Sequence, residues 1–220
     1  LKVEQNASVN LQNTSNSTGM QIYDGSAWVG GDLTIDSHGK NNVVTASKDN
    51  TGLELLDTKA YIGVEGTTKI DMQTDSSVGI YATAGTADLG ATTSSSPSNP
   101  SEVDFKTGSY TRNDENIAKV VLGKGSVRVG GIESTGIKIA AANTTNAALY
   151  QVAGKTVTAS GTTSNAVDVS TEDGTFDIDL AGTVENTTTT TQSDYAAVKM
   201  AGEGTIDIAS SANVTTTHDN

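Results

Sequence analysis

The chain has 220 residues, no cysteine and a net charge of −13. The lack of cysteine excludes a disulfide framework and thiolate metal sites. The net negative charge argues against binding to nucleic acid or to anionic lipid surfaces, because both bind basic patches on a protein. No apolar run reaches the roughly 18 residues of a membrane-spanning helix, so we expect no direct membrane insertion.

The composition indicates a narrow core. Aromatic residues make up 4% of the chain and charged residues 18%, alongside 23 glycines. A compact globule fills a wide core with large side chains. This chain instead favours a thin core of small and β-branched residues lined by strands.

Short strand-like phrases follow one another from the N-terminus. Gly-Met-Gln-Ile at 19–22 alternates in polarity, and Asp-Leu-Thr-Ile-Asp at 32–36 does the same after a turn at Asp24-Gly25. The phrase restarts at Gly52 and at Gly79. Alternation with a period of two predicts strands that have one buried and one exposed side.

Two polar stretches interrupt this pattern. The segment 92–102 is rich in serine and holds both prolines of the chain, and 109–116 is also polar. Proline has no N–H to give to a sheet, and clusters of Ser, Asn and Pro are typical of loops. We therefore expect surface-loop insertions at 92–102 and 109–116.

The phrase returns in the C-terminal half, most clearly at 195–208. There, Gly202-Glu-Gly204 predicts a turn between two strands. Asp173-Gly174 predicts a similar turn between the strands expected at 166–169 and 176–180.

The spacing of these phrases indicates a repeat. Gly19 and Gly52 are 33 residues apart, Gly52 and Gly79 are 27 apart, and the 57 residues from Gly79 to Gly136 are interpreted as two repeats. Periods of this size indicate a solenoid, a propeller or an array. Helical periodicity and propeller signatures are absent. Two or three short strands per repeat predict an all-β parallel β-helix of about 8–9 coils. A β-sandwich is the rival, but it does not explain why the strands resemble each other.

Two phrases carry a family resemblance. Gly-Leu-Glu-Leu at 52–55 and Gly-Ile-Tyr-Ala at 79–82 are each followed by a glycine turn and a second strand. They resemble the passenger domains of outer-membrane autotransporters (type Va secretion), especially the very large fusobacterial adhesins. The resemblance implies a right-handed parallel β-helix at the bacterial cell surface, with an adhesive role toward host cells or other bacteria.

The resemblance also implies a C-terminal translocator barrel, which has no counterpart here. The chain opens with Leu1 directly in a strand-like pattern and has no signal-like segment. We therefore interpret 1–220 as a single β-helix segment of a longer secreted passenger. Without an amphipathic cap at either end, such a segment is expected to fray or to associate end to end.

Motifs for catalysis are lacking. The two histidines, His38 and His218, form no zinc-binding motif, and no Gly-x-Ser-x-Gly phrase precedes a helix. We expect no enzyme activity, no cofactor and no metal site. The alternative is a carbohydrate-active β-helix enzyme, a polysaccharide lyase or tailspike-like hydrolase. Its carboxylates would be Asp177 and Asp179, two apart on one strand. The simpler interpretation of this pair is a solvated outer side.

The candidate binding residues are Trp28, Tyr110 and Arg112. Trp28 is the only tryptophan and is either an exposed anchor for a sugar or protein, or a buried filler of the coil. Tyr110 and Arg112 lie in the second insertion, and binding residues concentrate on loops held by a rigid scaffold. The expected partner is a protein or glycan receptor on a host or bacterial surface.

Overall fold

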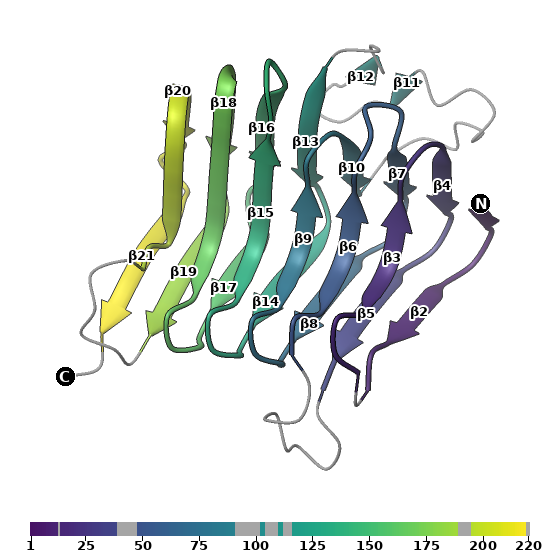
Figure 1. Cartoon of the computed structure of the whole chain (residues 1–220), viewed down its shortest axis with the longest axis horizontal. Helices are drawn as coiled ribbons and strands as arrows, with labels where there is room; N and C mark the ends of the chain where they lie inside the picture. Colours follow the sequence, from purple (N-terminus) through teal and green to yellow (C-terminus); the bar gives the residue numbers. More distant parts are fainter. Residues whose placement is uncertain are drawn as a thin grey trace.

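The computed structural model describes residues 1–12, 14–38, 48–90, 102–103, 110–111, 116–188 and 195–218. Within these ranges every regular element is a strand, and the strands wind into a coil (Figure 1). Neighbouring strands around the coil are parallel, so the predicted parallel β-helix is confirmed. No helix in the described ranges could cross a membrane.

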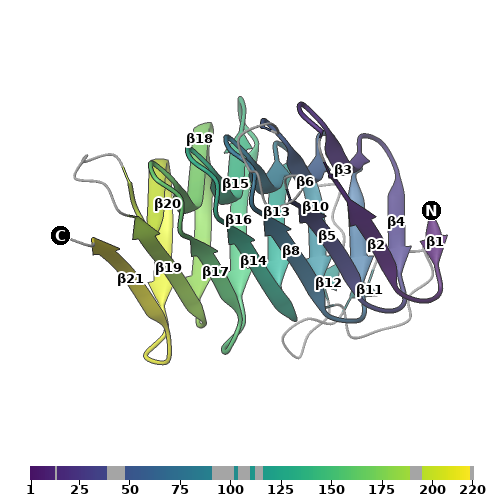
Figure 2. The same cartoon turned by 90° about the horizontal axis from the view of Figure 1, so that it is seen from below.

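The coil has three faces, visible as successive rows of strands in Figures 1 and 2. The first face contains β1 (Lys2–Val3), β4 (Ser26–Val29), β7 (Tyr61–Val64), β10 (Gly85–Leu89), β13 (Ile117–Leu122), β16 (Asn146–Gln151) and the later parts of β18 (Asn165–Leu180) and β20 (Val198–Ile208).

The second face is a sheet of its own. It contains β2 (Ala7–Asn10), β5 (Leu33–Ser37), β8 (Thr68–Met72), β14 (Gly125–Val129), β17 (Thr156–Ala159), β19 (Thr183–Thr188) and β21 (Asn213–His218). The third face contains β3 (Thr18–Ile22), β6 (Thr51–Leu55), β9 (Val78–Ala82), β15 (Thr135–Ala141) and the first parts of β18 and β20.

The coil makes about six turns, so the expected count of 8–9 is too high. One of the excess coils comes from the interval between Gly79 and Gly136. Their strands β9 and β15 are direct neighbours, with Val78 paired to Thr135, so the 57 residues between the two glycines form one repeat and not two. The reason is an additional strand and a long departure from the coil, described below.

Apolar side chains stack like with like on the inner side of each face. On the second face, one ladder places aliphatic residues in direct register on successive strands, and the first five are at most 1% exposed. The ladder comprises Ile35, Ile70, Val127, Val157, Val184 and, at the partly exposed end, Val214. Strands in register lie about 4.8 Å apart, so each rung buries its neighbours.

The corner between the third and first faces differs from expectation. We expected turns at Asp173-Gly174 and at Gly202–Gly204, but β18 and β20 run through both positions. Their pairing shifts register between Ser170 and Thr175. Such an irregularity bends a strand without removing it from the sheet, so on these two coils the chain passes this corner without a loop.

The corner between the second and third faces repeats on five coils. At each, one residue adopts a positive φ of 51° to 60°; these residues are Asn16, Asp49, Ser76, Glu133 and Thr163. The next residue is small and polar: Ser17, Asn50, Ser77, Ser134 or Ser164. The last four of these are 0% exposed, so the sharp corner brings a polar group inside.

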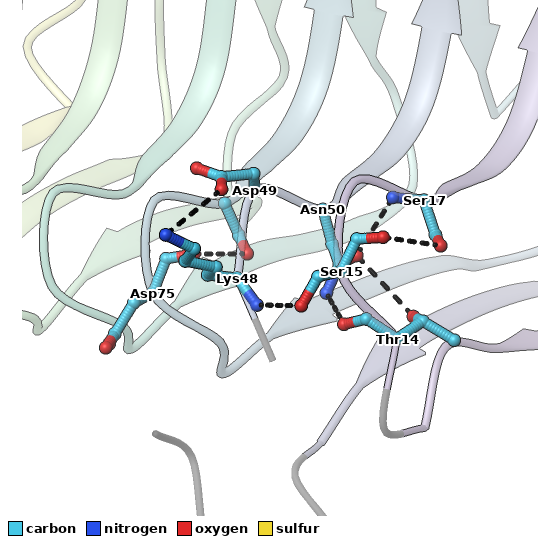
Figure 3. Close-up of polar contacts among 8 residues, drawn as sticks. Thr14, Ser15, Ser17, Lys48, Asp49, Asn50 and Asp75 are labelled. Atoms are coloured by element: carbon cyan, nitrogen blue, oxygen red, sulfur yellow. Dashed lines mark hydrogen bonds and ion pairs between the residues drawn. The ribbon is translucent and has the colours of Figure 1, made fainter. Parts of the chain in front are cut away.

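Hydrogen bonds between coils satisfy those buried groups. Asn50 accepts from the backbone N–H of Ser17 at 3.1 Å and donates through Nδ2 to the carbonyl of Thr14 at 2.9 Å (Figure 3). Further along, Ser134 Oγ accepts from the N–H of Ser77, and Ser164 Oγ accepts from the N–H of Ser134. The corner is therefore a continuous polar ladder parallel to the coil axis.

Candidate functional site

One strand of the first face is supernumerary. β10 pairs with β7 on one side and β13 on the other. On the other two faces the corresponding neighbours pair directly, β8 with β14 and β9 with β15. The chain thus leaves the coil after β10 and returns to the same face at β13. We call residues 91–116 the excursion.

Both predicted insertions, 92–102 and 109–116, lie in the excursion. The structure describes only parts of it, including β11 (Glu102–Val103) and β12 (Tyr110–Thr111), which pair antiparallel. Figures 1 and 2 both place this pair outside the coil, on the side of the first face. Antiparallel pairing distinguishes it from every strand pair of the described coil.

The outer side of the first face is buried near the excursion. Outward positions of a solenoid are ordinarily solvated. Here five of them are no more than 5% exposed: Trp28, Tyr61, Thr86, Asp88 and Val121. They lie on the neighbouring strands β4, β7, β10 and β13, so this part of the outer side is shielded from solvent. We call these five residues the covered patch.

Trp28 is buried on the outer side of the first face, so of the two alternatives for this residue the structure agrees with burial and not with an exposed anchor. Its side chain is 4% exposed. It does not fill the inside of the coil either, because Ala27 and Val29 on either side of it belong to the inner core. Instead the indole lies against Gly63 on the next strand, where the missing side chain leaves room for the ring.

Asp88 lies at the centre of the covered patch and is 1% exposed. It is in register with Gly63 on β7 and Val121 on β13, and neither carboxyl oxygen has a hydrogen-bond partner. Burial raises the pKa of the Asp88 carboxyl from 3.8 to about 7, and the positive charge of Lys119 partly offsets this effect. Sequence reasoning missed this residue, since an aspartate at an outward strand position normally contacts water.

Beyond the covered patch the same face becomes exposed and polar. The Lys119 ammonium lies 5.0 Å from the centre of the Tyr150 ring, a cation–π distance. The Tyr150 hydroxyl donates to Asp177 Oδ2 at 2.8 Å. Thr205 donates to Asp177 Oδ1 at 3.0 Å. These contacts link β13, β16, β18 and β20 across the outer side.

Asp177 and Asp179 lie on the same side of β18, as expected from their spacing. Asp177 is exposed, and each of its carboxyl oxygens accepts a hydroxyl hydrogen bond. Asp179 is in register with Tyr150 on one neighbouring strand and with Asp207 on the other. The row therefore offers carboxylates and an aromatic side chain in one line. Within the described ranges, no group of three or more His, Asp or Glu side chains could hold a metal ion.

The other two candidate residues lie in the excursion. Tyr110 lies on β12 and pairs with Val103 of β11, the strand pair that Figures 1 and 2 place outside the coil on the side of the first face. Arg112 lies outside the described residues. The structure thus brings Trp28 and the backbone of Tyr110 to the same side of the coil, although 82 residues separate them in sequence.

Comparisons with known proteins give no family assignment. No family model matches the chain, and neither the curated proteins nor the solved structures include a match.

Proposed function

We propose that this chain is a non-catalytic segment of a cell-surface adhesin, in which a stiff β-helix carries the excursion as its contact surface for a protein or glycan receptor. The observation that carries the proposal is the pairing of β8 with β14 and of β9 with β15. The coil closes on those faces without the excursion, so stacking of the coil does not require it.

The covered patch supports this role. Here Trp28 and Tyr61 present large buried side chains on the outward side, where a plain stalk would carry solvated residues. A contact surface that is carried on a rigid sheet loses less entropy when it binds a partner. The acidic charge of −13 suits a protein or glycan partner better than nucleic acid.

The cell-surface location rests on the resemblance of the phrases at 52–55 and 79–82 to autotransporter passengers. A repetitive, cysteine-free β-helix is consistent with that class of protein. The repeated corner and the stacked aliphatic ladder provide length and stiffness, which are the properties that a stalk requires.

A screen of the 220-residue chain against glycans and host-cell proteins tests the proposal. The matched variant replaces 92–102 with a short Gly-Ser turn and leaves the covered patch intact. We expect the parent chain to bind and the variant to lose binding while keeping the same circular dichroism. Equal binding by both proteins would show that residues 92–102 are not part of the contact surface.

A carbohydrate-active enzyme is the second candidate, because Asp177 and Asp179 share one side of β18 with Tyr150 next to them. Paired carboxylates on an open face can act as acid and base in glycoside cleavage. This candidate predicts depolymerisation of an acidic or neutral polysaccharide by the parent chain and its loss in Asp177→Asn and Asp179→Asn. The adhesin proposal predicts no product from any of the three proteins.

A further inference from the structure

Asp88 differs from the other carboxylates of the first face in its surroundings. Asp177 is exposed and accepts two hydroxyl hydrogen bonds, whereas Asp88 is 1% exposed and its two oxygens accept none. A buried carboxylate without donors loses its hydration and gains nothing in return. The neutral, protonated form is therefore the one that suits this position.

The position of Asp88 gives its protonation a structural consequence. It lies on β10, the supernumerary strand, in register with Gly63 of β7. Trp28 of β4 packs on that same glycine, and the Tyr61 hydroxyl is also close to it. A change in hydration at Asp88 thus occurs beside the two largest side chains of the covered patch.

The groups that face Asp88 offer it little compensation. Among side chains that the structure describes, β4 contributes Trp28, which does not titrate, and β7 contributes Tyr61, whose hydroxyl lies close to Gly63. β13 contributes Lys119, which is in register with Thr86 and not with Asp88, and its ammonium lies over the Tyr150 ring. Within the described ion pairs, Asp88 has no cation within 4.0 Å.

We propose that Asp88 is a pH-sensing residue of the first face: the protonated carboxyl keeps the outer side tightly packed around Trp28, and the ionised carboxylate draws water into it and loosens that packing. This inference concerns the coil itself and does not depend on the adhesin proposal. Because burial raises the pKa of Asp88 to about 7, the change falls near neutral pH.

The chain carries its own reporter for this change, because Trp28 is its only tryptophan and is buried next to Gly63. The experiment measures indole emission and acrylamide quenching of the 220-residue chain between about pH 5 and about pH 9. As the pH rises, we expect the emission to move to longer wavelength and the quenching to increase, with a midpoint near pH 7. In Asp88→Asn the transition should disappear.

Two variants serve as matched controls. Asp177→Asn removes an exposed carboxylate of the same face and should leave the transition unchanged. His38→Gln removes the histidine that directly follows β5 and should also leave the transition unchanged. The proposal is overturned if the transition persists in Asp88→Asn, is absent from the parent chain or vanishes in His38→Gln.

A further variant keeps the test decisive if Asp88→Asn does not fold. The Lys119 ammonium lowers the pKa of Asp88, so Lys119→Met should move the midpoint to higher pH. Circular dichroism confirms that this variant is folded. A midpoint that stays in place or moves to lower pH contradicts the assignment of the transition to Asp88.

Discussion

The indole of Trp28 lies so close to Gly63 that a Cβ atom added there would be 2.5 Å from Cζ3 of the ring. The same added atom would lie 2.9 Å from the Tyr61 hydroxyl oxygen. This contact explains how a tryptophan at an outward strand position becomes buried. The glycine removes one side chain from the outer row, and the ring occupies the space.

Gly63→Ala should therefore destabilise the fold. The added methyl group cannot be accommodated without moving the Trp28 ring, and overpacking of this kind costs about 1–3 kcal/mol. Chemical denaturation monitored by circular dichroism measures the effect as a loss in the free energy of unfolding.

A double-mutant cycle isolates the contact. In a Trp28→Leu background the ring is gone, so Gly63→Ala should cost less than it does in the parent chain. Equal costs in the two backgrounds would show that the Trp28 contact does not determine the requirement for glycine.

The free energy of unfolding should fall as the pH rises from about 4 to about 7. The unfolded chain releases the Asp88 proton near its ordinary pKa of 3.8, whereas the folded chain keeps it until about 7. Between these values the folded state binds the extra proton, so stability decreases with pH and the whole penalty remains above neutrality. Urea titrations at pH values across this window should show the decrease in the parent chain. A flatter profile is expected for Asp88→Asn, and identical profiles for the two proteins would rule out Asp88 as the cause.

Gly79→Ala should destabilise the third face. An added Cβ would lie 2.5 Å from the carbonyl oxygen of Gly136 on the neighbouring strand and 2.6 Å from the Val127 side chain. Since the nearest atom belongs to the backbone, the strands must separate, and we expect a loss of about 1–3 kcal/mol. Thermal or urea unfolding measures this loss. Ser126→Ala, an outward substitution on β14, is the control and should stay within about 0.5 kcal/mol of the parent chain.

Ser134→Ala should weaken the polar ladder at the corner. Its hydroxyl oxygen accepts from the N–H of Ser77 at 3.1 Å in a fully buried position. Removal leaves that N–H unsatisfied, which costs about 1–3 kcal/mol. Ser210→Ala, at an exposed position, should have almost no effect. If both changes had the same small effect on urea unfolding, the ladder would contribute little to stability.

Much of the fold could be predicted from local patterns. Alternation identified most strands because inner positions such as Ile35 and Ile70 must be apolar, whichever coil they belong to. The number of coils could not be predicted, because Gly79 and Gly136 look like members of a regular series. Only the pairing of Val78 with Thr135 shows that a single repeat lies between them.

The candidate site was less predictable, and the reason is physical. Trp28 and Asp88 sit at ordinary outward positions of alternating strands, so their sequence context indicates exposure. Both are nevertheless at most 4% exposed. Periodicity reports which side of a strand a residue occupies, but it carries no information about what covers that side.

Deletion of residues 86–118, which joins Gly85 to Lys119, tests most directly whether the excursion is a contact surface that the coil does not need. The register supports this junction: Gly85 pairs with Ala118 and Thr86 with Lys119, so Lys119 would take the place of Thr86 beside Tyr61. The deletion removes one first-face strand and the excursion and leaves the β8–β14 and β9–β15 pairings in place. We predict a folded β-helix with parent-like circular dichroism, an exposed Trp28 and no binding to the receptor found in the screen. A deletion variant that retains full binding would contradict the claim that the excursion is the contact surface. One that cannot fold would contradict the claim that the coil closes without it.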